Sequence, residues 1–323
     1  MTSRLVISLD FELHWGVHDL MSVDGYRRNL LGAREAVVRM LDVFVERGIR
    51  VTWATVGMLF CEDRDELMEL IPSARPTYRD ERLSPYHLCH EIGRNERDDP
   101  FHFAPSLVRQ IADAPGQELA THTFSHFYCL APGQREDQFR SDLRAAKTVA
   151  ARRGLADLRS IVFPRNQVNP GYLHVCAEEG LTAYRGTPSH YLYAPRDLAK
   201  ETPLRRLGRL VDAYLPAVPL SEAPQWHPDG ILDVPATRYL SQPRTALRAA
   251  ERLRVTRVRR DIRRAAARGG YVHLWWHPHD FGYEPAESMR ELGAILDEYE
   301  RAQHEFGMTS VSMADLAPRG DLP

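Results

Sequence analysis

The chain of 323 residues has few cysteines and no long apolar run. Its four cysteines are scattered, without a Cys-x-x-Cys pair, at Cys61, Cys89, Cys129 and Cys176. This pattern argues against a zinc ribbon or a disulfide framework and is typical of reduced cytosolic cysteines. No run approaches the roughly 18 apolar residues of a membrane span. The first residues lack a basic segment followed by a long apolar stretch, so we expect a cytoplasmic protein.

Sequence signatures of several common protein classes are also missing. No Gly-x-Gly-x-x-Gly follows an expected strand, and no Gly-x-x-x-x-Gly-Lys-Ser/Thr occurs, so nothing supports a dinucleotide or P-loop site. The absence of Gly-x-Ser-x-Gly argues against a serine hydrolase. A formal net charge of −2 argues against a dedicated nucleic-acid binder.

Short apolar runs alternate with amphipathic segments through most of the chain. We expect strands at residues 5–9, 49–56, 118–121, 160–163, 181–184, 231–234, 271–275 and 309–311. We expect helices at residues 33–46, 67–71, 107–111, 135–153, 172–179, 248–268 and 286–301. This alternation predicts a parallel sheet covered by helices, open or closed into a barrel. Two irregular segments, about 72–105 and 186–230, interrupt it, and we expect a single domain over 1–323 with these as loop insertions.

Histidine pairs provide the first chemical signal. Two imidazoles four residues apart lie on one face of a helical turn and can reach one divalent ion. Three such pairs occur, at His14/His18, His122/His126 and His273/His277. Because chance can produce this spacing among 14 histidines, the choice needs a third ligand, a base and an acid.

Polar clusters follow directly on four of the expected strands. They are Asp10/Glu12, His122/His126, Arg165/Asn166 and His277/His279. In a parallel barrel the carboxyl ends of the strands share one face, where active sites form. The clusters therefore predict a metal site of two histidines and one carboxylate, with a second acid nearby.

The order of these clusters resembles the polysaccharide deacetylase family, also called carbohydrate esterase family four or the NodB-homology domain. The matching segments are 8–12 (SLDFE), 122–126 (HTFSH), 163–167 (FPRNQ) and 274–278 (LWWHP). The resemblance implies a distorted (β/α) barrel of the seven-stranded type. Two features depart from the family pattern: Phe11 separates the two acids, which are usually adjacent aspartates, and the arginine segment lacks the Arg-x-Pro-x-Gly form.

The resemblance also implies a role for each matched residue. Asp10 would be the catalytic base, Arg165 would pair with it, and His277 would be the general acid. The metal ligands would be Glu12, His122 and His126. Which of Asp10 and Glu12 is the base and which binds the metal stays open. His279 or His273 could take the place of His277 as the general acid. Candidates for an aspartate that orients the acid histidine are Asp233, Asp280 and Asp212.

These roles predict a metal-dependent hydrolase that removes an N-acyl group, acetyl first of all, from an amino sugar or glycan precursor. Zinc suits the ligands, and Co²⁺, Ni²⁺, Mn²⁺ or Fe²⁺ could occupy the same ones. Residues expected near the substrate are His14, Trp15, Asn166, Trp275 and His279. The alternatives are an amidohydrolase acting on a cyclic amide or ureide and a barrel that only binds a carbohydrate. The arginine-rich helix 248–268 is either a solvated face or a cationic rim for a diphosphate- or lipid-linked sugar.

Overall fold

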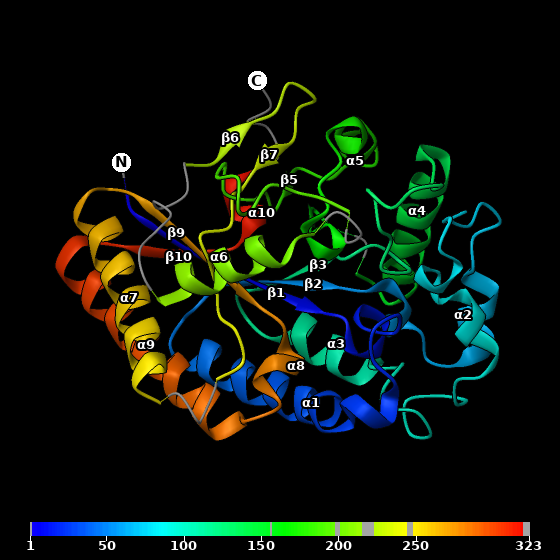
Figure 1. The fold of residues 1–323 in the computed structure, drawn as a ribbon, viewed down its shortest axis with the longest axis horizontal. Helices are drawn as coiled ribbons and strands as arrows, with labels where there is room; N and C mark the ends of the chain where they lie inside the picture. Colours follow the sequence, from blue (N-terminus) through cyan, green and yellow to red (C-terminus); the bar gives the residue numbers. More distant parts are fainter. Residues whose placement is uncertain (1, 156, 198–200, 215–222, 244–247, 319–323) are drawn as a thin grey trace.

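The computed structural model describes residues 2–155, 157–197, 201–214, 223–243 and 248–318, the side chains of 248–250 excepted. A parallel sheet, seen edge-on in Figure 1, runs through the middle of the molecule. Its main strands are β1 (Arg4–Phe11), β2 (Val51–Thr55), β3 (Gln117–Thr121), β4 (Ser160–Ile161), β5 (Ala183–Tyr184) and β9 (Tyr271–Trp276). β1 is central and pairs in parallel with β2 on one side and β9 on the other.

One extended segment closes the sheet into a barrel. Its first part is β7 (Leu232–Asp233), which pairs with β5, and its second part is β8 (Arg238–Tyr239), which pairs with β9. Backbone hydrogen bonds link the segment to Gly186 on one side and to His273 on the other. β6 (Gln225–Trp226) adds an antiparallel pair to β7. β10 (Thr309–Val311) pairs with the first half of β1. The expected distorted (β/α) barrel is therefore confirmed.

Helices form the outer layer. They are α1 (Val23–Glu46), α2 (Arg64–Leu70), α3 (Pro105–Asp113), α4 (Glu136–Arg152), α5 (Leu173–Glu178), α6 (Pro203–Tyr214), α7 (Arg248–Ala267), α8 (Pro278–Phe281), α9 (Pro285–Phe306) and α10 (Met313–Leu316). α7 and α9 lie side by side, and α1 and α8 continue the layer (Figure 1). The side chain of Ser22 accepts a hydrogen bond from Gly25, which caps α1, so this helix begins well before the expected residue 33. No helix in the described part of the chain is both long and apolar enough to cross a membrane.

Successive side chains of β1 point alternately to the apolar core beneath the helices and to the barrel interior. Leu5, Ile7 and Leu9 pack outward into the main apolar cluster beneath the helices. The even-numbered side chains point inward. Val6 belongs to a second cluster of mostly small residues contributed by successive strands, which Met313 of α10 joins. Polar residues Ser8 and Asp10 follow along the same face, toward the carboxyl ends of the strands.

The two expected insertions differ in structure. Residues 72–105 contain only short 3-10 turns between irregular stretches. Residues 186–230, expected to be irregular, contain α6 and β6, which the sequence analysis missed. α6 packs against α7. The short strand β8 was also missed, because Pro235 interrupts the apolar pattern that would have extended the strand at 231–234.

Candidate active site at the carboxyl ends of the strands

The predicted polar clusters meet at one face of the barrel. Asp10 lies near the end of β1 and Glu12 just beyond it, while His122 directly follows β3 and His277 directly follows β9. A cavity of about 910 Å³ opens here, and Asp10, Glu12, His126 and His277 are among its lining residues. This volume is typical of sites that bind small molecules.

Glu12, His122 and His126 form a buried cluster. Oε2 of Glu12 lies 3.2 Å from Nε2 of His122 and 3.1 Å from Nε2 of His126. Nδ1 of His122 lies 2.8 Å from the carbonyl oxygen of Val162, so Nδ1 donates to that carbonyl and Nε2 is the ring nitrogen directed at Glu12. That Nε2 is buried and has no hydrogen-bond partner among the described residues. Two imidazole nitrogens and one carboxylate oxygen that converge in a buried site are a donor set that fits zinc.

The ionisation of the cluster also suits a cation. Burial lowers the pKa of His126 to about 4 despite its contact with Glu12, so this imidazole is neutral at pH 7. Burial also opposes ionisation of Glu12. The neighbouring imidazoles, His277 foremost, outweigh burial and hold the pKa of Glu12 well below its usual value. An ionised carboxylate therefore faces a neutral imidazole.

The loop that carries the two histidines has a strained backbone, which Asp142 of α4 stabilises by hydrogen bonds. Thr123 and His126 have φ angles of 63° and 58°, in the left-handed region that non-glycine residues rarely adopt. Asp142 of α4 accepts hydrogen bonds from the backbone N–H of Phe124 at 2.7 Å and of Ser125 at 3.3 Å, and from the Ser125 hydroxyl. Burial raises the pKa of Asp142 to about 6. These bonds fix the turn that aims both imidazoles at Glu12.

Arg185 is the arginine that pairs with Asp10. Its Nη1 and Nη2 donate to Oδ1 and Oδ2 of Asp10 at 2.5 and 2.7 Å, and both side chains are buried. Asn166 accepts from Arg185 Nε at 3.1 Å, and Trp275 stacks 4.3 Å from the guanidinium. Burial opposes ionisation of Asp10, but the charge of Arg185 outweighs it and lowers the pKa of that carboxyl. Arg185 directly follows β5. The other site residues were selected because they follow expected strands, and the same criterion could have found Arg185.

The predicted Arg165–Asp10 pair is therefore wrong. Arg165 donates to Asp19 at 2.6 Å and lies 4.4 Å over the ring of Tyr128. Its φ angle of 53° lies in the left-handed region, within the short turn Pro164–Asn166. Arg165 still lines the cavity.

His277 lies between the two acids and a third carboxylate. Its Nε2 is 3.6 Å from Oδ2 of Asp10 and 3.8 Å from Oε1 of Glu12, and its Nδ1 is 3.1 Å from Oδ2 of Asp280. Burial favours the neutral imidazole, but Glu12 and Asp280 outweigh it and raise the pKa of His277 to about 9. Tyr239 donates to Asp280 and helps to fix it. Asp280 is thus the candidate aspartate that contacts this histidine.

Of the other candidates for these two roles, Asp212 lines the same cavity, whereas His273 and Asp233 do not. His273 is buried inside the barrel, where Nε2 is 2.8 Å from the hydroxyl of Ser8 and Nδ1 is 2.9 Å from that of Tyr271. Asp212 accepts from Arg257 at 3.1 Å. Asp233 lies in β7. The ring of His279, in contrast, stacks on that of His277 with centroids 4.8 Å apart, so it shares the site.

His14 and Trp15 are not part of the cavity lining. His14 Nδ1 lies 2.8 Å from His102 Nε2, and Trp15 donates to the carbonyl oxygen of His102 at 2.8 Å. Both side chains are buried beneath the 72–105 segment. The structure therefore gives them a packing role in place of the predicted position at the substrate cleft.

Asn166, Trp275 and His279 line the cavity, and their contact with a substrate stays a prediction. So do Arg254 and Arg257 of α7, although both are buried and paired with acids. Arg254 contacts Glu251 and Glu291, at 2.7 and 2.5 Å. The arginine-rich helix is thus neither wholly a solvated face nor a row of unpaired cations.

No family model matches the chain, and no curated protein matches it in sequence. Several solved structures are similar to it in fold. A protein from Mycobacterium smegmatis described as a "putative polysaccharide deacetylase" has 15% identity and a TM-score of 0.60, covering 98% of this chain and 88% of that one. A GH57-type branching enzyme from Pyrococcus horikoshii has 12% identity and a TM-score of 0.54, covering 98% and 70%. The α-amylase AmyC from Thermotoga maritima has 12% identity and a TM-score of 0.54, covering 98% and 74%.

At these identities the similarity shows a shared fold. The fold expected from the resemblance to polysaccharide deacetylases is confirmed, while the Asp-x-Glu form of the first motif stays a prediction. Because proteins described by different activities have this fold, the chemistry must be argued from the site itself.

Proposed function

We propose that this chain is a metal-dependent hydrolase that removes an N-acyl group, acetyl in the simplest case, from an amino sugar or glycan precursor. The observation that carries the proposal is the convergence of three buried side chains, with Nε2 of His122 and of His126 lying 3.2 and 3.1 Å from Oε2 of Glu12. The description of the Mycobacterium smegmatis neighbour agrees with this proposal.

Glu12, His122 and His126 would hold the ion. Two histidines and one carboxylate suit zinc best, although Co²⁺, Ni²⁺, Mn²⁺ and Fe²⁺ accept the same donors. When bound, such an ion lowers the pKa of water and polarises the acyl carbonyl. Because Val162 fixes the tautomer of His122, little reorganisation of that ligand is needed when the ion binds.

Asp10 would accept the proton of the attacking water. It must be ionised to do so, and the charge of Arg185 lowers its pKa against the effect of burial. Asn166 and Trp275 hold Arg185 in place, so they act on the base indirectly. The bidentate ion pair also fixes the direction of both carboxylate oxygens.

His277 would deliver a proton to the leaving amine. With its pKa raised to about 9, it is an imidazolium at neutral pH. Asp280 lies at Nδ1, and Nε2 is the ring nitrogen that approaches Asp10 and Glu12. Nε2 of His277, the proposed acid, lies 3.6 Å from Oδ2 of Asp10, the proposed base, so both groups can reach the same reacting centre.

Trp275 and Tyr239 place aromatic side chains in the cavity, where a sugar ring could contact them. Their ring centroids lie 4.5 Å apart, and both side chains line the cavity. Glycosidic-bond chemistry, suggested by the descriptions of two neighbours, has less support. It uses two carboxyl groups, one of which acts as an acid, whereas Asp10 is held by Arg185 and Glu12 faces two imidazoles.

The test measures metal content after dialysis and acetate release from N-acetylated amino sugars. We expect about one ion per chain, lost together with activity in His122→Ala/His126→Ala. The matched control is His174→Ala/His304→Ala, which changes two histidines outside the lining of this cavity. This variant should keep both the bound ion and the activity. Metal without acetate release, but with ring opening of a cyclic amide, would favour the amidohydrolase alternative. Absence of metal from the wild type after reconstitution would contradict the proposal and leave a carbohydrate-binding barrel.

A further inference from the structure

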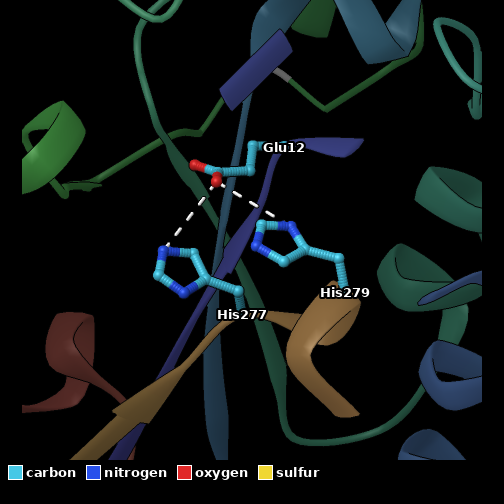
Figure 2. Close-up of side chains that lie close together, drawn as sticks. All are labelled: Glu12, His277 and His279. Carbon is cyan, nitrogen blue, oxygen red and sulfur yellow. Dashed lines mark ion pairs between the residues drawn. The ribbon is translucent and has the colours of Figure 1, made fainter. Parts of the chain in front are cut away.

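The two carboxylate oxygens of Glu12 face different pairs of histidines. Oε2 faces His122 and His126 at 3.2 and 3.1 Å. Oε1 faces the other way, 3.8 Å from Nε2 of His277 and 3.9 Å from Nδ1 of His279. Figure 2 shows this second group, with both imidazoles directed at the carboxylate from the chain that follows β9. Glu12 is thus shared by two groups of donors that could each hold an ion.

The second group has its own unsatisfied donor. Nδ1 of His279 is buried and has no hydrogen-bond partner in the described part of the chain, and the side chain is only 6% exposed. It points at Glu12 Oε1 rather than at solvent (Figure 2). A buried ring nitrogen without a partner is costly, and a cation would satisfy it.

His277 is arranged in the same way as His122. Its Nδ1 contacts the carboxylate of Asp280 at 3.1 Å, which leaves Nε2 directed at Glu12 Oε1 and at Asp10 Oδ2. A carboxylate on the far nitrogen of a histidine is the usual outer support of a metal-binding imidazole. Once Nε2 of His277 releases its proton to solvent, three donors, two of them imidazoles, surround one point on the Oε1 side of Glu12.

The spacing of these donors suits a weakly held ion. Metal–ligand distances of about 2.0–2.2 Å in a tetrahedral site place ligand atoms about 3.3–3.6 Å apart. The separations of 3.8 and 3.9 Å in the second group are slightly wider, whereas those around Oε2 are 3.1 and 3.2 Å. The first group should therefore fill first, and the second only at higher metal concentration.

We propose that a second divalent cation binds at Glu12 Oε1, His277 and His279, with Glu12 bridging it to the first. Its effect on turnover rests on the proposed function. An ion on Nε2 of His277 removes the proton donor and lies next to Asp10, the proton acceptor. The second ion is thus an inhibitor of the reaction that the first supports, and activity passes through a maximum as metal concentration rises.

The binding test uses the full chain and Zn²⁺ or Co²⁺ alone. Equilibrium dialysis of the wild type against rising metal should give two ions per chain, and Co²⁺ absorbance should change in two phases. His279→Ala should stop at one ion, and the exposed control His304→Ala should reach two. His279→Gln keeps the approximate size of the side chain, so it serves if His279→Ala unfolds, as thermal unfolding will show. One ion in the saturated wild type, or two in folded His279 variants, would overturn the proposal.

The activity test separates this proposal from the proposed function. Acetate release that falls at metal concentrations where the second ion binds, with a higher inhibitory concentration in His279→Gln, supports both. Two ions per chain without hydrolysis of any N-acylated amino sugar would contradict the proposed function while the site stands. Hydrolysis with one ion at all metal concentrations would contradict the second site alone.

Discussion

The guanidinium of Arg185 donates to both carboxylate oxygens of Asp10, at 2.5 and 2.7 Å, although Asp10 lies in β1 and Arg185 directly after β5. Removal of this charge should raise the pKa of Asp10, so the base would be protonated over more of the acidic range. We expect Arg185→Gln to reduce acetate release by about 10²-fold or more and to move the acidic limb of the pH–rate profile to higher pH.

Arg165→Gln is the matched control, because Arg165 also lines the cavity but pairs with Asp19. Its acidic limb should stay where it is. Loss of one partner from a buried ion pair costs about 3–5 kcal/mol, so folding of Arg185→Gln is checked by thermal unfolding, with Arg185→Lys as a milder change. A shifted limb in Arg165→Gln and an unshifted one in Arg185→Gln would restore the assignment predicted from the sequence.

The basic limb of the same profile should report His277. Its pKa of about 9 means that the protonated form is present at neutral pH and is lost as pH rises through that value. Asp280 raises this pKa, so Asp280→Asn should move the basic limb to lower pH, while the acidic limb changes less. The measurement is kcat/KM against pH for both proteins. An unchanged basic limb in Asp280→Asn would mean that another group is the acid.

Gly16 should be intolerant of any side chain because of Glu12. A Cβ atom at Gly16 would lie 2.0 Å from Cδ of Glu12, so Gly16→Ala must displace the carboxylate. We expect metal affinity to fall by about 10-fold or more, as for changes around a metal ligand. Gly293→Ala in α9 meets nothing within 4 Å and should leave affinity unchanged while stabilising the helix by about 0.5–1 kcal/mol. Equal metal affinities in the two variants would contradict this account.

Asp142 should make stability depend on pH. Its pKa is raised from 3.8 to about 6 in the folded protein, so the native state binds more protons than the unfolded state between these values. Its contribution to the free energy of unfolding is therefore full below pH 4 and is lost as pH rises toward 6, by roughly 3 kcal/mol. Denaturant unfolding of wild type and Asp142→Asn across this range tests the sign. A pH dependence as steep in the variant as in the wild type would contradict it.

The elements that could be predicted are those with a local signal. Apolar runs such as 5–9 and 271–275 became β1 and β9, and the polar residues after them met at one face because parallel strands end there. Glu12, His122 and His126 came together for this reason. Arg185 has the same signal, but the matched segment 163–167 drew the assignment to Arg165. The turn geometry that directs Arg165 to Asp19 cannot be read from residue order.

Other outcomes depend on long-range packing that the sequence does not display. His14 and Trp15 follow the first acidic motif closely, yet the 72–105 segment covers them through His102. The barrel closes through residues 232–240, where β7 falls within the strand expected at 231–234 but β8, beyond Pro235, has no strand pattern. α6 lies in a segment whose prolines and aromatic residues suggested irregular structure.

Anomalous diffraction at the zinc edge from crystals grown with low Zn²⁺ tests the central claim most directly. The account predicts one strong anomalous peak between Oε2 of Glu12 and the Nε2 atoms of His122 and His126. That peak should be absent from crystals of His122→Ala/His126→Ala. A wild-type structure soaked in Zn²⁺ with no peak there, and with Glu12 hydrogen-bonded directly to both imidazoles, would contradict the metal-dependent mechanism.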